Sequence, residues 1–239
     1  MGELLIQPKD IVVPGQVLAT GMDYLPAYDT FRDGEQIVAA RVGLVHLDGR
    51  LIKLVPLNGK YQPKRGDQVI GRVVDMTFSN WFVDINCAND AVLSSRDTSE
   101  YIDRGADLGK FFSHGDYIVA EIAKVTRGAI DLNMRGPGLR RLGPGKLIKV
   151  NATKVPRIIG KAGSMIMLIK ERTGCKISVG QNGLVWINGT PEQELQAMHA
   201  IQLIEERAHL EGLTDEITKF LGPGLALPPT EQTQGNDQA

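Results

Sequence analysis

The sequence predicts a multidomain protein in which a β-rich N-terminal domain is followed by a β-barrel and then by an α+β domain. Three observations predict this order. Short apolar runs separated by Gly, Pro and Asp fill roughly the first sixty residues, and longer runs that alternate apolar and polar residues follow from residue 68. Beyond residue 155, apolar residues recur at helical spacing. A chain of 239 residues is long enough for two or three small domains.

The N-terminal domain is predicted to span residues 1–62. Its β runs lie at residues 13–18 and 41–57, and Asp48-Gly49 is a hairpin turn signal. The segment has few aromatic residues and no excess of Lys and Arg. We therefore expect a domain that contacts protein rather than nucleic acid.

The second predicted domain spans residues 63–137 and is all β. Strands are expected at residues 68–76 and 81–85, and a closing hairpin at residues 117–125 and 129–134. The chain reads Gly71-Arg72-Val73 and then Phe78-Ser79-Asn80-Trp81-Phe82-Val83-Asp84. This stretch resembles the S1-type OB-fold, whose hallmark is Gly-x-Val, a short loop, an aromatic pair and Val-Asp.

The S1 resemblance implies an RNA-binding face on the barrel. OB-folds stack bases on aromatic side chains over a basic groove, and an aromatic residue that points inward fills the core instead. The sequence leaves both orientations open for each aromatic residue. S1 domains commonly carry a histidine where this chain has Ser94, so the chain departs from the family pattern there. The predicted RNA-binding residues of this domain are Arg72, Phe78, Trp81, Phe82 and Arg96.

Two glycines three positions apart, Gly160 and Gly163, separate an apolar turn from an apolar helix. Without a Cβ they allow a sharp turn and a close approach of the backbone to a ligand, and Ser164 then starts a helix whose first amides lack partners. Such amides favour a phosphate group. This is the GXXG signature of a KH domain, which clamps about four nucleotides. The predicted RNA-binding residues are Arg157, Ile159, Gly160, Lys161, Ala162, Gly163, Ser164 and Lys170.

The segments around the loop predict the rest of this third domain, residues 138–215. A strand at 146–150, a turn at 155–158 and a helix at 164–173 lead to strands at 175–179 and 184–187, which the turn 181–183 joins. Thr190, Pro191 and Gln193 then start a final helix as N-cap, first helical residue and capping-box residue. Leu195, Met198, Ile201, Ile204 and Ala208 recur along it at helical spacing. This is the order of a type I KH domain.

Positive charge is concentrated around this loop. Residues 135–176 carry eleven Lys and Arg against one acidic residue, Glu171, which gives a local net charge of +10. The remainder carries 16 basic and 27 acidic residues, and the whole chain has a net charge of −1. A localised basic block is typical of a nucleic-acid-binding surface.

No pattern in the sequence predicts catalysis, a metal or a cofactor. The four histidines are scattered, and no Walker loop or nucleophile elbow is present. A metal-dependent nuclease built from aspartates remains an alternative; those aspartates are Asp84, Asp90, Asp97, Asp103 and Asp107. Cys87 and Cys175 are predicted to be buried thiols, which is typical of a reducing cytoplasm. No apolar run is long enough to span a membrane, no secretory leader is seen, and residues 222–239 are predicted to be disordered.

The order of the three domains, with Val-Pro-Gly-Gln-Val-Leu at the N-terminus, resembles the RNA-binding cap subunit of the archaeal exosome, the ribosomal-RNA-processing protein four family. The resemblance covers residues 1–215. It implies a non-catalytic subunit of an exoribonuclease complex that binds single-stranded RNA and guides the 3′ end into a hexameric ring of RNase PH-like subunits. It also implies that the N-terminal domain docks on the ring beside other cap subunits, and that the protein is cytoplasmic.

Two other functions remain open at this stage. A transcription elongation or antitermination factor also joins S1 to KH, but that family carries two KH units of the other topology, and this chain has one GXXG. A subunit that only braces the ring, with vestigial RNA motifs, is the second. RNA binding by the isolated chain distinguishes this second alternative from a cap that captures RNA.

Overall fold

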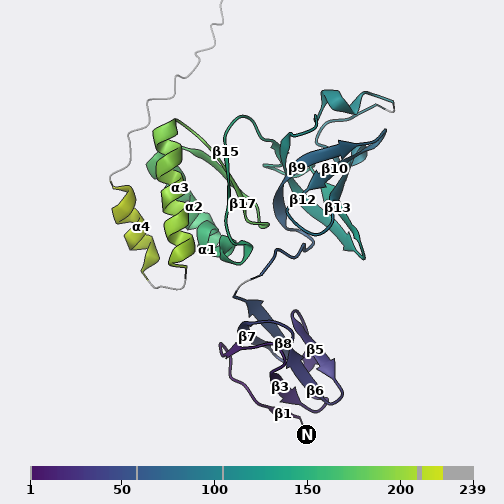
Figure 1. The fold of residues 1–239 in the computed structure, drawn as a ribbon, viewed down its shortest axis with the longest axis vertical. Coiled ribbons are helices and arrows are strands. Elements are labelled where there is room, and N and C mark those ends of the chain that lie inside the picture. Colours follow the sequence, from purple (N-terminus) through teal and green to yellow (C-terminus); the bar gives the residue numbers. More distant parts are fainter. Residues whose placement is uncertain (1, 58, 104, 209–211, 223–239) are drawn as a thin grey trace, which may run out of the picture. The chain divides into compact units, whose positions relative to one another are not determined.

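The computed structural model describes residues 2–57, 59–103, 105–208 and 212–222. The predicted disordered segment 222–239 therefore lies outside the described residues, apart from Gly222. The chain packs as two units, residues 1–60 and 61–239 (Figure 1). In the described part of the chain no helix is both long enough and apolar enough to cross a membrane.

The N-terminal unit consists of two four-stranded sheets that share one core. The first has the order β1-β3-β6-β5, with β1 Glu3–Leu4, β3 Val17–Thr20, β6 Gln36–Ala39 and β5 Thr30–Asp33. The second has the order β2-β7-β8-β4, with β2 Ile11–Val12, β7 Gly43–Asp48, β8 Leu51–Pro56 and β4 Leu25–Pro26. Leu18 and Ile37 of the first sheet pack with Val45 and Ile52 of the second. The predicted hairpin is confirmed, but its two turn residues are Gly49 and Arg50 rather than Asp48 and Gly49, because Asp48 still pairs with Leu51.

The second unit starts with a closed barrel. Its strand order is β13-β11-β10-β9-β12-β14, and β12 also pairs with β13 to close it. The strands are β9 Gln68–Met76, β10 Asn80–Asp84, β11 Ala91–Ser94, β12 Tyr117–Thr126, β13 Ala129–Asn133 and β14 Arg140–Arg141. A Cβ on Gly71 would lie 2.3 Å from Val83 Cγ1. The glycine of the Gly-x-Val motif on β9 therefore leaves room for the Val83 side chain of β10. The predicted OB-like barrel is confirmed.

The third domain has the predicted type I KH order. Its elements are β15 Lys146–Lys149, α1 Val155–Ile159, α2 Ser164–Thr173, β16 Lys176–Val179, β17 Leu184–Asn188 and α3 Pro191–Glu206. Gly174 ends α2 at φ 71°, and Thr190 with Gln193 forms a complete capping box on α3. The sheet has the order β15-β17-β16, and Figure 1 shows it between the helices and the barrel.

One helix was not predicted. Helix α4, Leu213–Leu221, packs on α2 and α3 through its buried side chains Leu213, Ile217 and Leu221. The KH core thus continues past residue 215. Along α3 the predicted apolar stripe is partly wrong: Leu195 is 46% exposed, and the small Ala197 and Ala200 are buried in its place, where α3 lies close to its neighbours.

Candidate nucleic-acid interface

The GXXG loop has a left-handed backbone at three of its four residues. The φ angles are 76° at Gly160, 52° at Ala162 and 81° at Gly163. A Cβ on Gly160 would lie 2.7 Å from the Met165 amide nitrogen, so the close turn onto α2 requires glycine. At Gly163 there is open space around the missing Cβ, and only the backbone angle favours glycine. Lys161 and Ala162 are exposed at the tip.

Helix α2 starts directly after this loop. Gly163 is its N-cap and provides no side-chain hydrogen bond, and Ser164 is exposed at the first helical position. The first amides of a helix have no partners within the helix and lie at the positive end of its dipole. The loop and the start of α2 therefore form a surface suited to a phosphate of a nucleic-acid backbone.

The basic residues around the loop do not all have the same role. Lys161 is exposed in the loop, and Lys170 is half-buried farther along α2. The Arg157 Nε donates to the Ala208 carbonyl at 2.9 Å, which fixes this exposed side chain against the end of α3. Arg172 donates to the Gly222 carbonyl at 2.7 Å and so holds the end of α4. Ile159 is half-buried at the end of α1.

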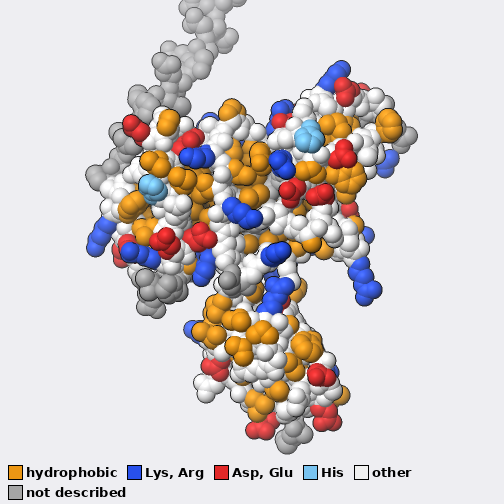
Figure 2. Space-filling view, in the orientation of Figure 1, with side chains coloured by type: hydrophobic (Ala, Val, Ile, Leu, Met, Phe, Trp, Pro, Cys, Tyr) orange, Lys and Arg blue, Asp and Glu red, His pale blue; other side chains and the backbone are white. Residues whose placement is uncertain are grey.

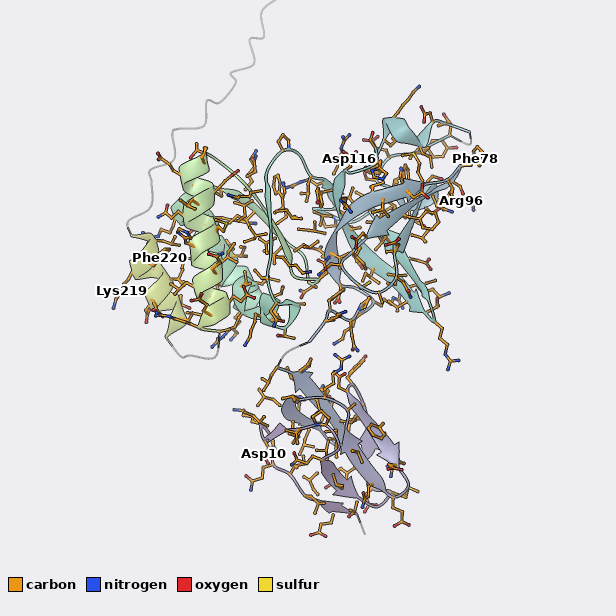
Figure 3. All side chains as sticks on the ribbon, viewed as in Figure 1. Asp10, Phe78, Arg96, Asp116, Lys219 and Phe220 are labelled. Atoms are coloured by element: carbon orange, nitrogen blue, oxygen red, sulfur yellow. The ribbon has the colours of Figure 1, made fainter. Side chains whose placement is uncertain are left out.

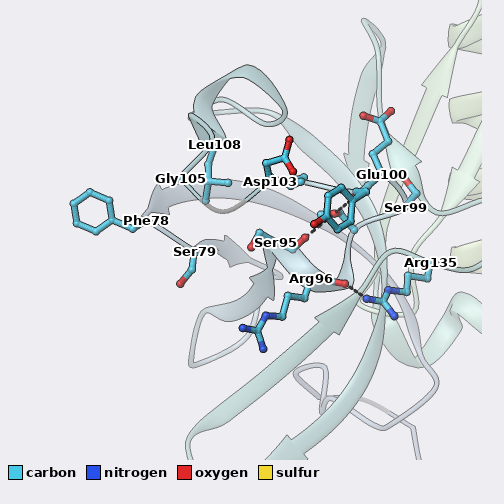
Figure 4. A pocket seen from close by; sticks show the side chains of 13 residues that line it. Phe78, Ser79, Ser95, Arg96, Ser99, Glu100, Asp103, Gly105, Leu108 and Arg135 are labelled. Carbon is cyan, nitrogen blue, oxygen red and sulfur yellow. Dashed lines mark hydrogen bonds between the residues drawn. The ribbon is translucent and has the colours of Figure 1, made fainter.

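A second candidate site lies on the barrel. It is a pocket of about 900 Å³ between the β9–β10 turn and the segment that follows β11. Phe78 stands at one end with its side chain fully in solvent, and Arg96 and Arg135 also line the pocket (Figures 3 and 4). The Arg135 guanidinium donates to the Arg96 carbonyl and lies 3.8 Å from the Asp97 carboxylate. A fully exposed aromatic ring at one end of a pocket that two arginines also line suits a stacked base and a phosphate of the same strand.

The segment that lines this pocket is held by local hydrogen bonds. The buried Thr98 hydroxyl lies 3.0 Å from the Ser95 carbonyl and 2.8 Å from the Glu100 carbonyl. Ser94, which stands in the place of the family histidine, accepts a hydrogen bond from the Arg96 amide at 3.3 Å. Ser94 therefore caps the short 3₁₀ turn Ser95–Asp97 that presents Arg96 to the pocket.

The prediction that Trp81 binds RNA is wrong. It is 0% exposed, its Nε1 donates to the Phe112 carbonyl at 3.1 Å, and its ring meets the Phe112 ring edge-on at a centroid distance of 5.1 Å. Trp81 is therefore part of the barrel core and cannot stack on a base. Side chains alternate along β10, so Phe82 lies on the outer face, half-buried, and remains a candidate.

The other predicted S1 residues separate into two groups. Phe78 and Arg96 lie together in the pocket, whereas Arg72 is exposed on β9 between Asp84 and Tyr117 of the flanking strands. Tyr101, which is 89% exposed, and Arg135 also line the pocket and were missed. Arg135 was counted in the basic block, so its charge was visible in the sequence, but its position beside Arg96 was not.

The described residues contain no group of three or more His, Cys, Asp or Glu side chains able to hold a metal ion. The aspartates of the nuclease alternative thus do not gather into such a site. Cys87 and Cys175 are free thiols; Cys175 is buried and Cys87 half-buried. Burial raises the pKa of both thiols.

These features define a protein with an S1-type barrel and a KH domain, each carrying a surface suited to single-stranded nucleic acid. Residues 60–124 match the family model of the Rrp4 S1 domain, and residues 146–205 match that of the KH domain. The exosome complex component Rrp4 of Methanothermobacter thermautotrophicus is 39% identical over 239 residues, covering 98% of this chain and 76% of that protein. That of Pyrococcus furiosus is 42% identical over 228 residues, covering 92% and 86%.

A solved structure assigned as an exosome complex RNA-binding protein is also similar. It is 37% identical with a TM-score of 0.61, and the match covers 68% of this chain and 95% of that one. The chain belongs to the Rrp4 family of exosome complex components. The transcription-factor alternative is not favoured by these matches.

Proposed function

We propose that this chain is the RNA-binding cap subunit of an archaeal exosome, which captures single-stranded RNA and guides its 3′ end into an RNase PH-like ring. The observation that carries the proposal is the presence of two RNA-type surfaces on one compact unit. These are the GXXG loop before α2 and the pocket that contains Phe78 and Arg96. Two modest sites that act on one strand bind it more tightly than either site alone.

The N-terminal unit supports a docking role. Ten of the sixteen exposed large hydrophobic side chains among the described residues lie within its sixty residues. Figure 2 shows hydrophobic side chains gathered on the visible face of this unit. Exposed apolar patches of this kind mark interaction sites.

The strand register places several of these side chains on one sheet face. Ile11, Leu44 and Val55 are paired across β2, β7 and β8, and Leu25 is paired with Leu51 across β4 and β8. Four of these five residues are exposed, and Leu44 is half-buried. The solvent face of a sheet is normally polar. We refer to these five residues as the apolar sheet face and propose that it docks on ring subunits of the exosome.

The remaining parts of the proposal rest on the membership of this chain in the Rrp4 family. The subunit is proposed to be non-catalytic and to need no cofactor, with the ring supplying the nuclease activity. Its proposed location is the cytoplasm, where the thiols of Cys87 and Cys175 stay reduced. Other cap subunits are its proposed neighbours, since several copies around one pore raise the local concentration of a bound RNA.

Co-purification tests the docking part of this proposal. Replacing Ile11 and Val55 by glutamate puts two charges on the apolar sheet face, and we expect the tagged chain to lose RNase PH-like subunits from a nuclease-treated extract. RNA binding by the isolated chain is expected to be unchanged. The matched control replaces Val125 and Leu195, two exposed apolar residues of the second unit, by glutamate and should retain the ring. Full recovery of the ring by a folded Ile11/Val55 variant, or recovery of RNA polymerase by the wild type, contradicts the proposal.

A further inference from the structure

The hairpin turn between β16 and β17 joins the KH sheet to the barrel. The turn spans residues 180–183 and is closed by the Gly183 amide, which donates to the Gly180 carbonyl at 3.0 Å. Its Gln181 amide donates to the Gln68 carbonyl of β9 at 2.8 Å. The tip of the KH hairpin therefore lies directly against the barrel rather than in solvent.

One side chain in this turn bonds to two parts of the barrel. Asn182 is 1% exposed, although amide side chains are mostly exposed in proteins. Its Oδ1 accepts from the Ile70 amide at 3.2 Å, and its Nδ2 donates to the carbonyls of Ile70 at 2.7 Å and Ile85 at 2.9 Å. The buried amide is thus satisfied entirely by backbone groups of β9 and of the residue that follows β10.

The backbone around Asn182 is shaped for this contact. A Cβ on Gly180 would lie 2.7 Å from the Ile70 amide nitrogen, and one on Gly183 would lie 2.3 Å from the Val150 carbonyl oxygen. Glycine on each side therefore allows the turn to fit between the barrel and the KH domain. The sequence separation between Asn182 and Ile70 is 112 residues, so this is a long-range contact between two domains.

Further contacts surround this central one. Trp186 of β17 packs with the barrel core, and its Nε1 donates to the Gly143 carbonyl at 3.2 Å. Lys149 of β15 donates to Asn86 Oδ1 at 2.8 Å. The connection between β14 and β15 is short, residues 142–145, and Asn188 of β17 donates to its Pro144 carbonyl at 2.8 Å.

We propose that Asn182 is a positioning residue that holds the barrel pocket and the GXXG loop at one fixed separation. This inference rests on the proposed RNA-binding function. When two sites are fixed at a separation that one strand can span, binding at the first site makes binding at the second intramolecular. Asn182 thereby increases the affinity for a long strand without touching RNA itself.

The test compares a short and a long RNA on the full chain with Asn182→Ala. A single-stranded RNA of about five nucleotides fills only one site, and one of about 20 nucleotides spans both. We expect the affinity for the long RNA to fall about tenfold while that for the short RNA stays unchanged. The control Asn89→Ala removes the same side chain from an exposed position on the barrel and should change neither affinity.

NMR relaxation of the backbone amides gives a readout that does not depend on RNA. The barrel and the KH domain are expected to tumble together in the wild type and with different correlation times in Asn182→Ala. If that variant does not fold, Asn86→Gly removes the acceptor of Lys149 while keeping the positive φ at residue 86, and we expect a smaller change of the same sign.

Three results would overturn the inference. The first is an equal loss of affinity for the short and the long RNA in Asn182→Ala. The second is no loss of affinity for either RNA in that variant when it is folded, and the third is a single correlation time for its barrel and KH domain. If the wild type binds neither RNA, the proposed function itself fails, and the inference that rests on it fails too.

Discussion

Replacing Lys161 and Ala162 by aspartate is expected to weaken the binding of single-stranded RNA while the chain stays folded. Both side chains are exposed, and the left-handed backbone at Ala162, with φ 52° and ψ 29°, is one that aspartate tolerates. The variant removes a cation from the tip of the loop and puts two carboxylates beside the amides at the start of α2. Loss of one charge-assisted hydrogen bond costs about 2 kcal/mol, which corresponds to roughly a thirtyfold increase in Kd.

Fluorescence anisotropy at several salt concentrations measures this effect. The slope of log affinity against log salt should become shallower by about 0.7 for each RNA phosphate that the variant no longer neutralises. The matched control is Ala123→Asp with Lys124→Asp, which makes the same two exchanges on exposed residues of β12 and should retain most of the affinity. Unchanged affinity and slope in the folded Lys161/Ala162 variant would show that RNA does not bind at the GXXG loop.

Phe78→Ala is expected to weaken RNA binding and Trp81→Ala to destabilise the fold, although the two residues are close in sequence. The Phe78 side chain is fully exposed, so its removal should leave the stability of the fold unchanged and lower RNA affinity by about 1–3 kcal/mol, because a base can no longer stack on the ring. Trp81 lies in the barrel core against Phe112. Its truncation should lower the free energy of unfolding by about 3–5 kcal/mol.

Urea unfolding and RNA titration of the same variants separate these two effects. Phe220→Ala, which removes a partly exposed phenylalanine of α4, is the control for Phe78→Ala and should change RNA affinity little (Figure 3). The pocket assignment is wrong if Phe78→Ala binds RNA as the wild type does. The core assignment is wrong if Trp81→Ala unfolds at the wild-type urea concentration.

Local signals in the sequence predicted much of the fold of the second unit. Strand β9 and helix α2 begin and end at their predicted residues. The strand was predicted from alternating apolar and polar residues and the end of the helix from Gly174, and both signals involve only residues that are close in sequence. The capping box of Thr190 and Gln193 is a short local pattern and was equally visible. Such features need no knowledge of the tertiary structure.

Features that depend on distant parts of the chain could not be predicted in this way. The direction of Trp81 depends on which face of β10 meets the core, and Asn182 looks like an ordinary turn residue until β9 is placed beside it. Tyr101 and Arg135 reach one pocket from segments separated by two strands. Helix α4 follows a break after α3, and its apolar side is explained only by its packing on α2 and α3.

RNA decay in a reconstituted assembly tests the central claim most directly. RNase PH-like ring subunits from the same source would be mixed with a long single-stranded RNA and phosphate, with and without this chain. We predict that the chain alone leaves the RNA intact, that adding it to the ring accelerates decay of the long RNA, and that the Lys161/Ala162 aspartate variant loses part of this acceleration. Degradation of RNA by the chain alone, or a rate that does not change when the chain joins the ring, would contradict a non-catalytic subunit that captures RNA.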